Sequence, residues 1–338
     1  MTALSTPLPD DLIASLRRAG LLAPDEAAMG EPLSGGVSSD IWRVDRRAGA
    51  LCVKRALPRL RVAAFWEAPV ERNAFEVAWL EVAAGVDASC VPRLRGHDVA
   101  AGLFMMDYLD PARHPLWKSE LRDGRADPAV AAAVGARLVR IHAATAHDAS
   151  VAQRFRTDAF FHALRLAPYL EAAAERHPGV AAELHALVQV TANTREALVH
   201  GDVSPKNILI GAGGPIFLDA ECAWYGDPAF DLAFCLNHLL LKCLWTPAAR
   251  PAFLRCFEAL CAAYAAGVSW CEWPALEARA ARLLPGLLLA RVDGKSPVEY
   301  LVDAAQKNTV RRAALALLAA PVPHLAGVRA HWNRELTR

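Results

Sequence analysis

The feature that most constrains this chain is a polar loop, His200–Asn207, that lies between short apolar runs. The loop contains Asp202 and Asn207, and Asp219 follows the second apolar run after it. Two such runs separated by a Gly-rich turn are typical of strands in a hairpin. The pattern therefore predicts a loop and a hairpin that hold two carboxylates and an amide at strand ends, where a rigid scaffold can aim them.

These side chains suit the transfer of a phosphoryl group to a hydroxyl. That reaction needs a hydroxyl held in line, a carboxylate to take its proton, and metal ions to neutralise phosphate charge. We expect Asp202 to orient and deprotonate the hydroxyl. Asn207 and Asp219 offer oxygen ligands of the kind that Mg²⁺ takes, and Glu221 is a further candidate ligand, directly or through water. Turn closure and helix capping would explain single residues of this set, but not their order.

A second polar motif lies upstream, in a predicted pair of strands. Gly35, Gly36 and Ser38 form a small turn before the first strand, and Lys54 ends the second. Glycine and serine allow backbone N–H groups to approach phosphate oxygens closely. We expect the turn to cover the phosphates of ATP and Lys54 to reach the α- and β-phosphates. An ordinary turn and a solvated lysine are the alternatives.

Taken in order, the motifs resemble those of the aminoglycoside phosphotransferase and choline kinase superfamily, which are small-molecule kinases. Protein kinases have His-Arg-Asp with Asn at the same spacing. Gly201 stands in place of that arginine, which is the small-molecule form. The Asp-x-Glu triplet at 219–221 and the Trp-Tyr-Gly run at 224–226 are similar to methylthioribose kinases in particular.

The resemblance implies an α+β, bilobal protein-kinase-like fold. The N-lobe, residues 1–107, is expected to be a small antiparallel sheet with one or two helices, and the C-lobe, residues 108–338, to be mainly helical. Apolar periodicity and frequent alanine agree with this division. The run at 232–244 is interrupted by polar residues, which indicates a buried core helix and not a membrane span. The predicted helices are 9–20, 69–84, 129–144, 160–176, 180–190, 228–244, 251–266 and 274–290.

Kinase-like folds use a helix glutamate to hold the strand lysine in place. The resemblance points to Glu76, with Glu71 and Glu81 as competing candidates. The structural alternative for Glu76 is a surface pair with Arg72, four residues earlier on the same helix, which would contribute only about 0.2–0.5 kcal/mol.

The resemblance also implies roles outside these motifs. The backbone near Met106 and Tyr108 is expected to pair with the adenine edge. Asp231 is expected to anchor the backbone of the catalytic loop from the start of a helix. The alternative for the segment 291–297 is a solvated loop that joins two helices. The acceptor is expected to meet C-terminal residues, and the candidate contacts are Trp224, Asp227, Arg291 and Asp293.

Composition argues against several other classes of protein. The net charge of +1 gives no global electrostatic case for binding nucleic acid or an acidic membrane. The 8 cysteines include no Cys-x-x-Cys pair, so we expect reduced core residues. No secretion signal is evident at the N-terminus. These observations predict a cytoplasmic protein.

The sequence thus predicts an ATP- and Mg²⁺-dependent phosphotransferase that phosphorylates a hydroxyl of a small molecule, with a sugar-like, amino-alcohol or aminoglycoside acceptor. Few residues separate Asp219 from the helix near Asp231, which leaves no room for the activation loop that carries peptide substrates. The alternative is a nucleotide-binding pseudokinase that acts as a regulatory or interaction module, although Lys54 and Asp202 are intact. The identity of the acceptor, GTP as donor and the oligomeric state stay open.

Overall fold

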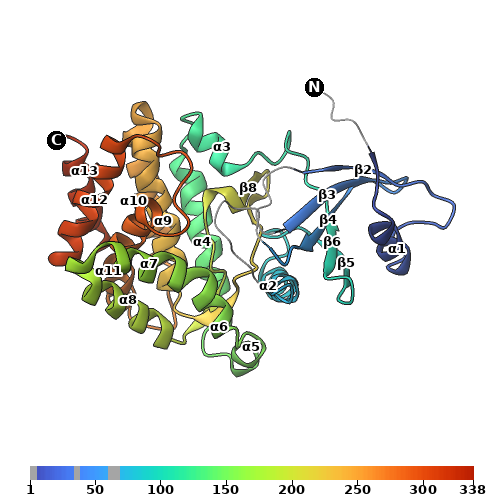
Figure 1. Cartoon of the computed structure of the whole chain (residues 1–338), viewed down its shortest axis with the longest axis horizontal. Helices are drawn as coiled ribbons and strands as arrows, with labels where there is room; N and C mark the ends of the chain where they lie inside the picture. The colour runs from blue at the N-terminus through green and yellow to red at the C-terminus, as the bar shows by residue number, and fades with distance from the viewer. Residues whose placement is uncertain (1–5, 34–38, 60–68) are drawn as a thin grey trace. The chain divides into compact units, whose positions relative to one another are not determined.

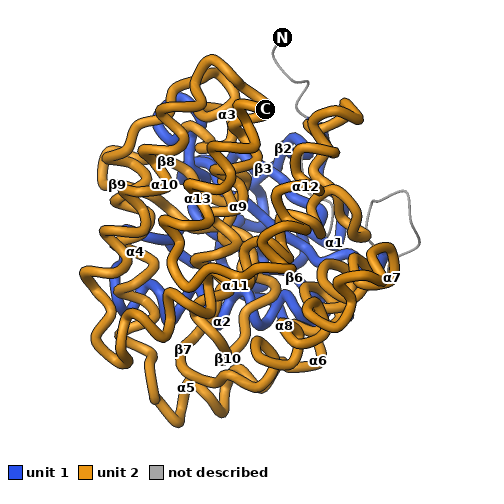
Figure 2. The backbone as a smooth tube through the Cα atoms, turned by 90° about the vertical axis from the view of Figure 1, so that its left-hand side faces the viewer, with its two compact units in different colours: residues 1–114 blue, residues 115–338 orange. Residues whose placement is uncertain are grey.

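The computed structural model describes residues 6–33, 39–59 and 69–338, so the predicted turn with Gly35, Gly36 and Ser38 lies outside the described residues. The chain forms two compact units, residues 1–114 and 115–338 (Figure 2). The first is built on an antiparallel sheet and the second mainly on helices (Figure 1), which confirms the predicted α+β class. The lobe boundary after residue 107 stays a prediction.

The first unit contains a six-stranded antiparallel sheet in the order β1–β2–β3–β4–β6–β5. The central strand β4 pairs with β3 on one side and with β6 on the other. The strands are β1 (Thr6–Pro7), β2 (Met29–Pro32), β3 (Ser39–Asp45), β4 (Leu51–Ala56), β5 (Leu94–Asp98) and β6 (Leu103–Asp107).

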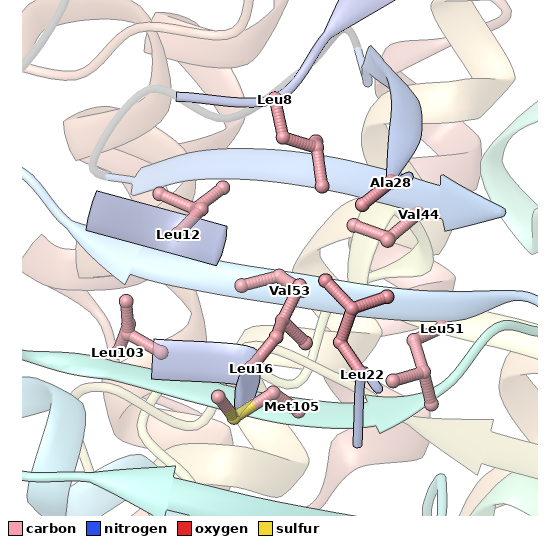
Figure 3. Close-up of a cluster of buried hydrophobic side chains, with 10 residues drawn as sticks. All are labelled: Leu8, Leu12, Leu16, Leu22, Ala28, Val44, Leu51, Val53, Leu103 and Met105. Carbon is pink, nitrogen blue, oxygen red and sulfur yellow. The ribbon is translucent and has the colours of Figure 1, made fainter. Parts of the chain in front are cut away.

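One face of this sheet is covered by α1 (Asp10–Arg18), which the sequence predicted over 9–20. Figure 3 shows the apolar cluster between them, in which Leu12 and Leu16 of the helix pack with Val53 and Met105 of the strands. Leu12 and Leu16 share one helix face because they are four residues apart. Burying a side chain of this size stabilises the fold by about 1.5–3 kcal/mol.

The neighbour of Val53 along β4 is Lys54, which points to the opposite face because side chains alternate along a strand. There it meets α2 (Arg72–Val86), which contacts β4, β5 and β6. Trp79 of α2 is fully buried. The alternation along β4 thus places a lysine beneath a helix, while its neighbour Val53 packs against α1.

The second unit is mainly helical, as predicted. The helix α4 packs against α10, and α9 packs against α10 and α11. Every residue from Ala229 to Leu244 in α9 is buried, which confirms the predicted core helix. The helices are α3 (Trp117–Arg122), α4 (Pro128–Thr145), α5 (Ala149–Arg154), α6 (Asp158–Phe161), α7 (Ala172–Arg176), α8 (Ala181–Asn193), α9 (Ala229–Trp245), α10 (Arg250–Ala265), α11 (Trp273–Asp293), α12 (Ala304–Ala319) and α13 (Leu325–Glu335).

Two predictions about helices need correction. The helix expected over 160–176 is divided, because a π-helix, η1 (His162–Glu171), lies between α6 and α7. Pro168 inside it has no N–H to give to a regular helix. The helix expected over 274–290 continues to Asp293, so Arg291 is helical and buried, and does not lie in a solvated loop.

Two small sheets complete the second unit. Strand β7 (Ala197–Val199) pairs with β10 (Trp224–Gly226), and β8 (Ile208–Gly211) forms a hairpin with β9 (Gly214–Phe217). This hairpin is the one that the sequence predicted. Arg137 of α4 donates to carbonyl oxygens of the hairpin.

Among the residues that the structure describes, no helix has the length and apolar character needed to cross a membrane. All 8 cysteines lie in the described part and are unbridged; Cys261 and Cys271 are partly exposed, and the others are buried, as predicted for core residues.

Candidate active site

The polar loop that follows β7 is fixed by Asp231, in the first turn of α9. Asp231 is fully buried and accepts hydrogen bonds from the backbone N–H groups of His200, at 2.7 Å, and Gly201, at 2.8 Å. Its Oδ2 also lies 3.3 Å from Nε2 of His142 on α4. These contacts confirm the predicted structural role of Asp231.

The backbone at Gly201 explains why this position is a glycine. Its φ is +79°, and a Cβ there would lie 2.6 Å from the carbonyl oxygen of Cys222. An L-residue would be strained by both features. The glycine therefore lets the chain turn into the loop directly before Asp202.

Asp202 is buried between two cations. Its Oδ2 lies 3.0 Å from Nη2 of Arg165 and 3.1 Å from Nζ of Lys206. Burial alone would raise the pKa of Asp202, but Lys206 and Arg165 outweigh burial and hold it below its usual range. The carboxylate is therefore ionised at neutral pH.

His200 braces the same loop. Its Nδ1 accepts the backbone N–H of Asp202 at 3.1 Å, so its Nε2 carries the proton that is donated to the carbonyl oxygen of Leu218, also at 3.1 Å. Burial lowers the pKa of His200, which keeps the ring neutral and suits this tautomer. The histidine thus joins the loop to the residue before Asp219.

The hairpin brings Asn207 beside Asp219. The backbone N–H of Leu218 donates to the carbonyl oxygen of Asn207 at 2.9 Å. The Nδ2 of Asn207 donates to the carbonyl oxygen of Asp202 at 3.1 Å, which leaves the amide oxygen for another partner. Asp219 has a φ of +66°, a left-handed conformation that is uncommon outside glycine. Strain of this kind, on the order of 1–3 kcal/mol, is concentrated at functional sites.

The donor set suits Mg²⁺. The described residues contain no group of three or more His, Cys, Asp and Glu placed to hold a metal. Mg²⁺ does not need such a cage, because it keeps waters and takes one or two carboxylates together with substrate phosphates. The amide oxygen of Asn207 and the carboxylate of Asp219 fit that requirement, and Glu221 follows two residues later.

The first unit contains the lysine of the upstream motif. Lys54 Nζ lies 2.8 Å from Oε1 and 2.7 Å from Oε2 of Glu76, and the two side chains are only 4% and 3% exposed. Glu76 thus makes the contact that the resemblance implied. Arg72 is also buried, so Arg72 and Glu76 do not form a surface pair. A role of Lys54 in holding phosphates stays a prediction.

The adenine-binding residues implied by the resemblance lie at the end of β6. Met106 is buried in this strand, paired with Cys52 of β4 and Leu94 of β5. Tyr108 follows the strand, and the guanidinium of Arg43 lies 5.0 Å from the centre of its ring. Their pairing with adenine stays a prediction.

The candidate acceptor residues are mostly engaged in buried contacts. Trp224 stacks on Phe161, with ring centres 4.2 Å apart, and donates from Nε1 to Asp158 at 2.9 Å. Asp227 is buried and pairs with Arg279 at 3.1 Å. These contacts fix the fold locally, and an acceptor role for Trp224 and Asp227 stays a prediction.

The two candidates at the end of α11 differ from each other. Asp293 is paired with Arg311 at 2.7 Å and with His177 at 2.8 Å. Among the described residues, the hydrogen-bond partners of Arg291 are uncharged: the hydroxyl of Tyr169 at 3.1 Å and the backbone and side chain of Ser296. Asp293 is therefore neutralised by its neighbours, and Arg291 is not.

Sequence reasoning missed Arg165 and Lys206. Lys206 stands directly before Asn207, so its place in the motif was a usable signal. Arg165 comes from the π-helix, 37 positions before Asp202, and also donates to the carbonyl oxygen of Gly201. No local sequence pattern predicts the contact of Arg165 with Asp202, because this contact depends on tertiary structure.

Comparison with known proteins identifies relatives. The sequence model of the phosphotransferase enzyme family (APH) matches residues 30–273, more than half of the chain. The methylthioribose kinase of Pectobacterium carotovorum is 26% identical over 255 residues. The match covers 66% of this chain and 62% of that kinase, so the chain spans less than two thirds of the length of this relative.

Solved structures share the fold at low identity. The macrolide 2'-phosphotransferase of Brachybacterium faecium has a TM-score of 0.52 and 22% identity, and the match covers 93% of this chain and 99% of that one. The ethanolamine kinase of Plasmodium vivax has a TM-score of 0.55 and 11% identity, with 97% and 86% covered. These likenesses confirm the kinase-like fold.

Proposed function

Since the chain belongs to the phosphotransferase enzyme family, we propose that it is a small-molecule kinase. The proposed reaction is ATP + R–OH → ADP + R–O–phosphate + H⁺, in which R–OH is a small molecule with a hydroxyl group. The observation that carries the proposal is the buried, ionised Asp202 held beside Asn207 and Asp219. A match to the family model does not by itself assign catalytic or metal-binding roles to these residues.

Asp202 would accept a hydrogen bond from the acceptor hydroxyl and take its proton as the new O–P bond forms. Its lowered pKa makes it a weak base before the reaction. That property suits a transition state in which the leaving bond is largely broken first and the hydroxyl loses its proton late. Arg165 and Lys206 hold the carboxylate, and Lys206, with a half-exposed side chain, could also meet the transferred phosphoryl group.

Asn207 and Asp219 would hold Mg²⁺, and Glu221 would act on it directly or through water. When bound, the ion neutralises the charge of the phosphates. Lys54, held by Glu76, would contact the α- and β-phosphates, and the turn with Gly35, Gly36 and Ser38 would cover them. Met106 and Tyr108 would offer backbone groups to adenine.

The names of the similar proteins refer to different acceptors: methylthioribose, macrolides and ethanolamine. What these names share is a hydroxyl-bearing small molecule, and the proposal for this chain is stated at that level. The sugar-like and amino-alcohol classes are the first to test.

The test combines a product assay with two variants. With Mg-ATP and a panel of alcohols, sugars and amino alcohols, Asp202→Asn should reduce turnover by at least ~100-fold and leave nucleotide binding intact, the usual scale for a general base. Asp219→Ala should abolish Mg²⁺-dependent nucleotide binding, as measured by calorimetry. Asp148→Asn is the control, because Asp148 only caps α5 and asparagine caps equally well.

Two results would overturn the proposal. If the protein binds Mg-ATP but phosphorylates no acceptor of the panel, the pseudokinase alternative replaces it. If Asp202→Asn turns over at the rate of the control, Asp202 is not the base.

A further inference from the structure

Lys242 of α9 is buried without an acidic partner. It is 1% exposed, and its side chain makes no hydrogen bond or ion pair with any described residue. Its Nζ lies 4.2 Å from the ring centre of Trp245 and 4.3 Å from that of Tyr300, and these two rings stack 4.4 Å apart. Cation–π contacts of this kind contribute about 2 kcal/mol when desolvated, which does not replace the hydration of a buried ammonium.

Three further polar atoms in this region are buried and have no hydrogen-bond partner in the described part of the chain: Nε2 of His238, Nε of Arg291 and the hydroxyl oxygen of Tyr300. Buried polar groups are normally hydrogen-bonded, so each exception needs an explanation. His238 is one turn before Lys242 on α9. The cationic cluster is defined here as His238, Lys242, Arg291 and Tyr300.

The surroundings of this cluster do not neutralise it. Burial, followed by the charge of Lys118, lowers the pKa of Lys242 to about 7, and Arg291 acts in the same direction. Among the described residues, Glu299 is the acidic group that acts on Lys242, and it is exposed and already paired with Lys118. Burial and then Arg291, Lys242, Lys206 and Lys118 keep the pKa of His238 well below its usual value, so this ring is neutral.

The cationic cluster lies close to the proposed base. Two guanidinium groups lie near the ring of Tyr169: that of Arg291 is 5.5 Å from the ring centre, and that of Arg165 is 5.9 Å from it. Arg165 in turn contacts Asp202 at 3.0 Å. A single tyrosine therefore separates Arg291 from the arginine that holds the base.

We infer, resting on the proposed kinase function, that the cationic cluster binds an anionic group of the acceptor, which is thus a hydroxyl compound that also carries a carboxylate or a phosphate. An anion here would accept hydrogen bonds from the four donors that lack them. Charge-assisted bonds to Lys242 and Arg291 are the stronger ones. A polycationic aminoglycoside would instead bring ammonium groups towards two buried cations.

The first experiment uses acceptors that share a skeleton and differ in charge. The three-carbon set is glycerol, D-glycerate, glycerol 3-phosphate and 3-amino-1,2-propanediol, and the six-carbon set is glucose, gluconate, glucose 6-phosphate and glucosamine. We expect the KM of the best anionic compound to be at least ~10-fold below that of its neutral analogue, the scale of one charged hydrogen bond. Lys242→Met should remove this preference. Lys307→Met, which removes a lysine without a side-chain ion pair on α12, should keep it.

The KM of the anionic acceptor should also depend on pH. Lys242 is protonated below its pKa of about 7 and loses its charge above it. Anion binding should therefore weaken as the pH rises from about 6 to 9, and Lys242→Met should flatten this dependence. The groups that act on Lys242 across this range are Lys118, Arg291 and Glu299.

A binding measurement separates this inference from the kinase function. The titration of Lys242 can be followed by NMR of protein labelled with [¹⁵N]lysine, without turnover. We expect the best anionic compound of each set to raise the pKa of Lys242, and the neutral and cationic compounds to leave it unchanged. Anion binding without phosphorylation of any acceptor would contradict the kinase function and support the anion site. Phosphorylation of neutral or cationic acceptors in preference, or a pKa that no anionic compound raises, would sink the anion site and keep the kinase.

Discussion

Two buried lysines, one in each unit, are accommodated in opposite ways. Lys54 of β4 lies within 2.8 Å of both carboxylate oxygens of Glu76. Lys242 of α9 lies against the stacked rings of Trp245 and Tyr300 and has no carboxylate partner among the described residues. The first unit therefore completes its ion pair from its own residues, whereas the second leaves a buried cation that a ligand could neutralise.

The two arrangements differ in what each charge contributes to folding. A buried pair repays its desolvation only while both partners are present, so removing one is strongly destabilising. A buried lysine without an acid opposes folding whenever it is charged, and its pKa falls. At position 54, the lysine serves both stability and the proposed function. At position 242, the proposed function favours a lysine, whereas stability favours an uncharged residue.

The largest expected effect is at Glu76. Glu76→Ala leaves Lys54 buried without its carboxylate, and we expect a loss of about 3–5 kcal/mol in the free energy of unfolding, as measured by urea denaturation. Adding Lys54→Met should recover part of the loss, because the unpaired charge is then gone. Glu81→Ala, at an exposed site on the same helix, is the control. A loss equal to the control would mean that the pair does not hold the unit together.

The opposite sign is expected at Lys242. Lys242→Met should stabilise the unliganded protein at neutral pH by on the order of 3 kcal/mol, since the pKa of Lys242 is about 7 in the fold against about 10.4 when unfolded. Between these two values the unfolded chain binds the extra proton, so wild-type stability rises with pH. The advantage of the variant should therefore be largest below pH 7 and shrink towards pH 10. Thermal unfolding across this range, with Lys307→Met as control, is the measurement, and a destabilised or pH-independent variant would contradict the comparison.

A third buried cation, Arg165, lies between these extremes, because its carboxylate partner is the proposed base. Arg165→Met should lower the free energy of unfolding by about 2 kcal/mol, the scale of a hydrogen bond to a charged group. It should also raise the pKa of Asp202, since burial then acts against Lys206 alone. The acid limb of the kcat profile should move to higher pH, because the base must be ionised. The control is Arg255→Met, at an exposed site of α10, which should leave the acid limb unmoved. An unmoved acid limb in Arg165→Met would show that Arg165 does not act on the base.

The sequence predicted what depends on neighbouring residues. The loop at 200–207, the hairpin after it and the start of α9 near Asp231 follow from strand periodicity, turn residues and helix-start preference, which are all local. The prediction that Lys54 contacts Glu76 came from the family resemblance and not from the spacing of residues.

What the sequence missed depends on distant segments. Arg165 lies in the π-helix, which contains Pro168, and a helical pattern of apolar residues does not distinguish a π-helix from an α-helix. Arg291 and Asp293 read as charged loop residues, yet partners from distant segments, such as Tyr169 and Arg311, let both be buried in α11. In the sequence, Lys242 is one of the polar residues that interrupt a core helix, and its aromatic partner Tyr300 comes from beyond α11.

The smallest effect separates two tyrosines with buried hydroxyl groups, one with a partner and one without, as for the two lysines. The hydroxyl of Tyr264 lies 2.7 Å from Nδ1 of His142, and the hydroxyl of Tyr300 has no partner among the described residues. Tyr264→Phe should therefore destabilise the protein by about 1 kcal/mol, whereas Tyr300→Phe should change the free energy of unfolding by less than about 0.5 kcal/mol. With an anionic acceptor present the order should reverse, because Tyr300→Phe then removes a donor to the anion and raises its KM several-fold. Equal effects of Tyr300→Phe with and without the acceptor would show that this hydroxyl plays no part in anion binding.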